Sequence, residues 1–140
     1  MDPLAFTLEF HGKAVELDPG RLWAETRAIL DGGELDGFGA AEALCRRDLE
    51  LTSDGSLVER GEITLGGANA ITFSARGRLR ASPDPMLRHG TAILEVTGGR
   101  GRLAGARGFI TSNFLLSQSG ELTDHHQGLL FLETAKESSK

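Results

Sequence analysis

Residues 96–110 read Val-Thr-Gly-Gly-Arg-Gly-Arg-Leu-Ala-Gly-Ala-Arg-Gly-Phe-Ile, with five glycines in the eleven positions from Gly98 to Gly108. A dinucleotide-binding loop needs a strand, a glycine turn and then a helix whose N-terminus meets the pyrophosphate. Here the residues after Gly108 read Phe-Ile-Thr-Ser-Asn-Phe, which favours another strand. A P-loop would need Gly-Lys-Ser/Thr, and no lysine lies between Lys13 and Lys136. We therefore interpret the glycines as a tight connection between two strands.

Alternation of apolar and polar residues with a period of two runs through most of the chain, as in half-buried strands. It is clear at Phe6, Leu8 and Phe10, and Ser53-Asp54-Gly55 is a hairpin turn signal. Further strands are expected at 49–52, 57–65, 71–79, 90–97, 108–117 and 122–133, with a loop at 82–85. Residues 21–30 allow helical spacing, although a strand is favoured. Seven or eight short strands predict a β-sandwich or a closed barrel.

Length and composition fit a single domain over residues 1–140, with a frayed polar tail at about 135–140. Cys45 is the only cysteine and cannot form an internal disulfide, which fits a reducing compartment. We expect a cytoplasmic protein, because neither a signal peptide nor an apolar run of about 18 residues is visible. The net charge of −5 with dispersed arginines does not favour nucleic acid as a partner.

The segment from Gly98 to Gly108 resembles the Gly-Gly-Thr-Gly-x-Phe-x-x-Ala-Arg-Gly signature of the allene oxide cyclase and dirigent-like barrels. Arg100 stands where that signature has threonine, and Leu103 where it has phenylalanine. The resemblance is clear over residues 93–132 and only architectural before them. In that family the signature shapes a turn between strands and supplies no catalytic group.

The resemblance implies an all-β fold, a single antiparallel eight-stranded calycin-like barrel with an apolar cavity. Members commonly form homodimers or homotrimers. They steer reactive intermediates, in cyclisation of a fatty-acid epoxide, in stereoselective phenol coupling and in ring formation on bacterial polyketides. We accordingly expect a barrel that self-associates and takes an apolar small molecule.

Three residues are candidates for acid–base catalysis. Glu95 lies in the otherwise apolar run Ala-Ile-Leu-Glu-Val, and a carboxyl group inside an apolar barrel would have a raised pKa. The alternative is an outward-facing glutamate that pairs with arginine. His125 and His126 belong to the densest polar group, Asp124-His125-His126-Gln127. Strand alternation places them on opposite faces, so at most one can enter the cavity, and a surface role is the alternative for each.

Four further residues are candidates for binding a substrate. Asn113 lies in the middle of an expected strand although asparagine has poor β propensity, and such an inconsistency can mark a ligand contact. A cross-strand hydrogen bond explains Asn113 equally well. Trp23 either lines a cavity or packs in the core, and Phe73 lies on the apolar face of its strand. Arg76 begins a row of arginines that could bind an anionic group, or could be the solvated outside of a barrel.

We expect a cofactor-independent cyclase or isomerase that confines an apolar metabolic intermediate, in natural-product biosynthesis. No metal-ligand spacing is convincing, so neither a metal nor a cofactor is expected. Two other functions stay open from the sequence. One is a non-catalytic barrel that binds a small molecule, and the other is an oligomeric interaction protein whose barrel is filled by side chains.

Overall fold

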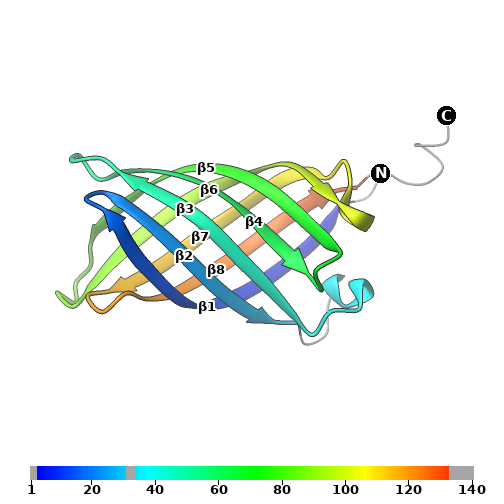
Figure 1. Ribbon diagram of the computed structural model, residues 1–140, viewed down its shortest axis with the longest axis horizontal. Helices are drawn as coiled ribbons and strands as arrows, with labels where there is room; N and C mark the ends of the chain where they lie inside the picture. Colours follow the sequence, from blue (N-terminus) through cyan, green and yellow to red (C-terminus); the bar gives the residue numbers. More distant parts are fainter. Residues whose placement is uncertain (1–2, 31–33, 133–140) are drawn as a thin grey trace.

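The computed structural model describes residues 3–30 and 34–132 and shows a closed barrel of eight antiparallel strands in chain order (Figure 1). The strands are β1 (Leu4–Asp18), β2 (Arg21–Ile29), β3 (Glu42–Leu51), β4 (Ser56–Leu65), β5 (Asn69–Ala81), β6 (Leu87–Arg100), β7 (Arg107–Ser117) and β8 (Glu121–Phe131). The expected eight-stranded antiparallel fold is confirmed. Within the described residues there is no α-helix, and no helix is long and apolar enough to cross a membrane.

The two ends of the barrel differ. At one end lie the 3₁₀ turns η1 (Glu34–Phe38) and η2 (Gly101–Leu103), and we call this the η end (Figure 1). Tight turns close the other end, the hairpin end, including the predicted turn at Ser53-Asp54-Gly55, where Gly55 has a φ of +85°. Residues 21–30, ambiguous in the sequence, contain strand β2. The predicted frayed tail lies outside the described residues.

The glycine-rich segment is a strand connection, as predicted, and it also closes the η end. Strand β6 continues to Arg100, further than the sequence indicated, and then turns through η2. Gly101 has a φ of +66°, and a Cβ there would lie 2.3 Å from the carbonyl oxygen of Ala68. Beyond it, Leu103 and Ala106 are fully buried against the interior. The glycines thus let the backbone turn tightly enough to insert two apolar side chains into the end of the barrel.

Three phenylalanine rings in the interior pack against inward-facing glycines on the neighbouring strand. The directly paired residues are Phe6 and Gly128, Phe73 and Gly61, and Phe114 and Gly90. A Cβ on Gly90 would lie 2.0 Å from the Phe114 ring. Each glycine therefore provides the space that an aromatic ring fills, a pairing that also specifies strand register.

The interior is divided into layers along the barrel axis. One apolar cluster, with Leu30, Leu35 and Leu103, fills the η end, and a second, with Leu22, Leu57 and Leu122, fills the hairpin end. Between them lie six buried polar side chains that we call the polar layer: Thr26, Arg47, Glu59, Ser112, Asp124 and His126. This layer is where charge is buried, and it positions the candidate site.

The wall of the barrel is loosest between β1 and β2. Their ladder starts at the pair His11–Arg27, so residues 4–10 of β1 pair with β8 alone. Leu30 directly follows β2, on the other side of this gap. Its backbone N–H donates to the Ala41 carbonyl oxygen and not to β1. The gap opens at the η end.

Replacing Gly90 by alanine should destabilise the protein by about 1–3 kcal/mol, because the new methyl group must displace the buried Phe114 ring. Gly98→Ala in the same strand is the matched control, since its Cβ would meet its nearest atom at 3.6 Å. Urea denaturation of both variants measures the difference. Equal unfolding free energies would contradict the assigned packing.

Candidate functional site

The polar layer is centred on Asp124, which receives three partners at once. Ser112 Oγ donates to its Oδ1 at 2.7 Å, His126 Nε2 lies 2.8 Å from its Oδ2, and Arg47 Nη2 lies 2.7 Å from the same oxygen. Arg47 Nη1 also lies 3.2 Å from Glu59 Oε1. The side chains of Arg47, Glu59, Asp124 and His126 are all 0% exposed. One guanidinium therefore joins two buried carboxyl groups.

Small neighbours make the path of Arg47 across the barrel possible. Arg47 on β3 is paired with Ala24 on β2 and Gly61 on β4, and a Cβ on Gly61 would lie 2.7 Å from the Arg47 Cβ. Asp124 belongs to β8, which is not adjacent to β3 in the barrel. The guanidinium carbon also lies 5.5 Å from the centre of the Phe114 ring, a cation–π contact. The long side chain thus spans the lumen.

The two carboxyl groups have opposite environments. Burial alone would raise the pKa of Asp124, but the charge of Arg47 and the hydrogen bonds from His126 and Ser112 outweigh burial and hold that pKa well below its usual value. Burial raises the pKa of Glu59, and Arg47 offsets this only in part. Neither Glu59 oxygen accepts a hydrogen bond from the described residues. Asp124 is the fixed anion of the layer, and Glu59 holds a proton more readily.

Two further buried groups, Arg47 in the layer and Cys45 beside it, each keep one protonation state. Burial alone would lower the pKa of Arg47, but Glu59 and Asp124 together raise it above its ordinary value, so the side chain stays a cation. Burial raises the pKa of the Cys45 thiol to about 12. Cys45 is therefore a neutral core residue at physiological pH.

His126 occupies the side of the layer that faces the η end. Its ring centre lies 4.7 Å from that of Phe10, and on the neighbouring strands it pairs with Leu8 and Ser112. Nε2 contacts Asp124, whereas Nδ1 is buried and has no hydrogen-bond partner among the described residues. With Nε2–H donated to the Asp124 carboxylate, neutral His126 presents a bare Nδ1 lone pair. Such a nitrogen can accept a proton.

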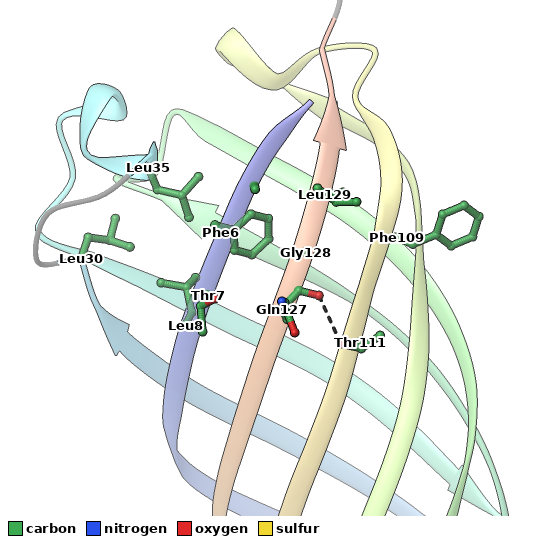
Figure 2. Close-up of a pocket in the computed structure, with 11 residues that line it drawn as sticks. Phe6, Thr7, Leu8, Leu30, Leu35, Phe109, Thr111, Gln127, Gly128 and Leu129 are labelled. Carbon is green, nitrogen blue, oxygen red and sulfur yellow. Dashed lines mark hydrogen bonds between the residues drawn. The ribbon is translucent and has the colours of Figure 1, made fainter. Parts of the chain in front are cut away.

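A pocket of about 560 Å³ lies at the gap between β1 and β2, next to this histidine. Four apolar side chains from both sides of the gap line it, namely Phe6, Leu8, Leu30 and Leu35 (Figure 2). It extends over β1 to outward-facing residues of β8 and β7, where Thr111 Oγ1 donates to the Gln127 carbonyl oxygen at 3.3 Å. Leu8 pairs with His126 across the ladder, and Gly128 follows His126 by two residues on β8. Both line the pocket.

Comparisons with known proteins bear on the fold. No protein-family model and no curated protein sequence matches the chain. Among solved structures, the pterocarpan synthase dirigent protein GePTS1 is similar, with a TM-score of 0.67, 11% sequence identity, and coverage of 94% of this chain and 89% of that chain. This chain folds as a dirigent-like barrel. At that identity the similarity shows the fold alone, and no family model supports the resemblance to allene oxide cyclases.

Two of the seven candidate residues point into this dirigent-like barrel. His126 belongs to the polar layer, and Phe73 packs in the core against Gly61. Glu95 and Asn113 point outward, which is the alternative that the sequence left open for Glu95, and Asn113 makes the alternative cross-strand hydrogen bond, with His89 on β6. Both lie on the outer face, because Leu94 and Val96 are the inward residues of β6, and Ser112 and Phe114 those of β7.

The outward candidates do not share one site. Asn113 and His125 are directly paired, and Asn113 Oδ1 also bonds His89 Nε2, so these three surround a surface pocket of about 290 Å³. His125 Nε2 lies 3.4 Å from Glu9 Oε1. Arg76 and Trp23 are likewise on the outer face, away from the lumen, which matches the solvated alternative for the arginine row. None of the five outward candidates, Glu95 included, can contact a molecule held inside the barrel.

Arg47, Glu59, Ser112 and the central role of Asp124 were missed from the sequence. A signal for Glu59 was present, because it shares its strand face with Leu57 and Ile63. Arg47 likewise alternates in phase with Cys45 and Leu49. A charged residue in phase with apolar residues on a half-buried strand is the pattern to look for. Within the described residues, no group of His, Cys, Asp or Glu side chains is placed to hold a metal ion.

Replacing Arg47 by leucine should destabilise the protein by about 3–5 kcal/mol, because two carboxyl groups lose their buried cation. Arg46→Leu is the control, because Arg46 is the next residue to Arg47 in the chain but makes an exposed ion pair, with Glu25 at 2.8 Å. That pair should contribute no more than about 1 kcal/mol. Chemical denaturation at neutral pH measures both variants, and similar losses would contradict a structural role for the buried ion pair.

Proposed function

We propose that this barrel binds an apolar small molecule in the pocket beside the β1–β2 gap and holds it in one conformation while it cyclises or isomerises, without a cofactor. The observation that carries this proposal is the position of His126, which pairs across the ladder with the pocket-lining residue Leu8 and is held by an ionised aspartate. An apolar pocket with few converging polar groups is typical of small-molecule sites. The likeness to a dirigent protein called a pterocarpan synthase supports a role in natural-product biosynthesis.

In this proposal the pocket confines the substrate and His126 moves one proton. Confinement removes conformational freedom before the reaction and favours one ring-closing geometry. Asp124 keeps the Nε2 proton of His126 in place, which leaves Nδ1 to accept a proton from the substrate and return it. Rotation of the Leu8 side chain, at the edge of β1 that lacks a partner strand, gives the substrate access to the histidine.

Leu30→Trp should fill the pocket and abolish retention of the apolar ligand. Val58→Trp is the matched control, since Val58 is exposed on β4 and lies outside the pocket. Mass spectrometry of organic extracts from the purified proteins measures the retained compound. An identical compound at equal yield in both variants would reject the pocket. With that compound in hand, retained binding but lost turnover in His126→Gln separates an enzyme from a carrier.

Self-association is a second role, and the outer surface favours it. Ile93, Phe109 and Leu129 are 59%, 58% and 47% exposed, and the last two are directly paired on β7 and β8. Contiguous exposed apolar side chains are typical of protein interfaces. Phe109 and Leu129 also belong to the outer lining of the pocket, so a second copy seated here would cover part of it.

Phe109→Lys should shift the protein toward the monomer, since a charge would be placed in the apolar contact. Val15→Lys, at a residue 57% exposed on β1 and outside the patch, should leave the oligomeric state unchanged. Light scattering after size exclusion, over a range of concentrations, measures the mass. A wild-type protein that is monomeric throughout would exclude this role.

A further inference from the structure

The polar layer contains more acids than its cation can balance. Arg47 carries one positive charge, and Asp124 and Glu59 would carry two negative charges if both were ionised. A net charge in an apolar interior is strongly destabilising even after the surroundings relax. The layer is therefore neutral only when it holds one further proton.

The geometry shows where that proton cannot sit. Asp124 accepts a hydrogen bond from Ser112, faces the His126 ring and pairs with Arg47, so it is held as the anion. Arg47 stays charged, and Cys45 beside it stays a neutral thiol. These are the titratable groups buried here together with Glu59 and His126, since β1, β5 and β6 present apolar residues at this level, such as Phe10, Ala75 and Leu94.

Two sites for the proton remain. Glu59 is flanked in the ladder by Leu49 and Ala75, and its oxygens accept no hydrogen bond within the described part of the chain. His126 has an unpartnered, buried Nδ1. Both groups face the same fixed pair, Arg47 and Asp124.

We propose that the polar layer holds one extra proton, which lies either on the Glu59 carboxyl group or on His126 Nδ1. These two groups are not hydrogen-bonded to each other. In one state Glu59 is a neutral acid and His126 a neutral imidazole with hydrogen on Nε2. In the other, Glu59 is a carboxylate and His126 an imidazolium. The two states differ in which group carries the proton, and both have zero net charge.

This inference deepens the proposed function, on which its catalytic use rests, and names Glu59 as a positioning residue. A proton that the layer already holds lets His126 either give or accept one beside Leu8, which lines the pocket. Glu59 acts through Arg47 and the histidine and touches no substrate. The location of the proton is measured on the ligand-free protein, so its failure and the failure of the pocket proposal are separate results.

The test compares Glu59→Gln with Glu62→Gln. The first mimics the neutral acid without a removable proton, and the second neutralises an exposed carboxylate on the same strand, paired with Arg100 at 2.6 Å. Above the usual glutamate pKa of about 4.3, the folded wild type should hold one proton more than folded Glu59→Gln. The unfolding equilibrium constant of the wild type should then rise about tenfold per pH unit relative to that variant. Glu62→Gln should show no such slope relative to the wild type.

Nitrogen-15 NMR of the histidine rings locates the proton. We expect the Nδ1 resonance of His126 in the wild type to lie between the neutral and imidazolium positions, and in Glu59→Gln at the neutral position. Infrared spectra should show a protonated carboxyl band that Glu59→Gln loses, Glu62→Gln keeps, and His126→Gln strengthens. An ionised Glu59 with a neutral His126 would overturn the proposal, as would identical His126 resonances in the wild type and Glu59→Gln. If the layer variants do not fold, the wild-type resonance and band decide the question by themselves.

Discussion

The contact between Arg47 and Asp124 is the constraint on which the rest of the interior depends. An arginine with no exposed side-chain surface must meet a carboxylate, because an unpaired buried charge would destabilise the fold by several kcal/mol, on the order of 3–5 kcal/mol. To reach β8, its side chain crosses the lumen, and this requires the small residues Ala24 and Gly61 on the adjacent strands. The register in which β3 pairs with β2 and β4 therefore depends on one ion pair.

This ion pair also lies at the boundary between the two ends of the barrel interior. The polar layer separates the apolar cluster of the hairpin end from that of the η end, and the pocket lies on the η side. There the β1–β2 ladder is incomplete. His126 belongs to the layer and pairs with the pocket-lining Leu8. Its hydrogen bond to Asp124, which Arg47 keeps ionised, fixes the orientation of its ring.

Much of the fold was predictable from local patterns. Alternation of apolar residues indicated the strands, and the glycines of residues 98–108 indicated a turn, since both depend on backbone geometry within a few residues. Strand ends were less predictable, because β6 extends through Gly98 and Gly99 by pairing with β5. The sequence left the face of Glu95 open because the outer face of β6 is itself apolar at Ile93, which hid the phase of the alternation.

The sequence by itself determined an all-β barrel and showed that the glycine-rich segment 98–108 is a turn between strands. It also indicated that one histidine of the Asp124–Gln127 run can face inward. Which histidine does so, and what surrounds it, was decided only by the tertiary structure. Arg47 and Glu59 come from the paired strands β3 and β4, whereas Asp124 comes from β8, far along the chain, so Arg47 meets Asp124 only after the barrel closes. Local patterns report which face a side chain takes, whereas the partner of a buried charge depends on what lies across the lumen.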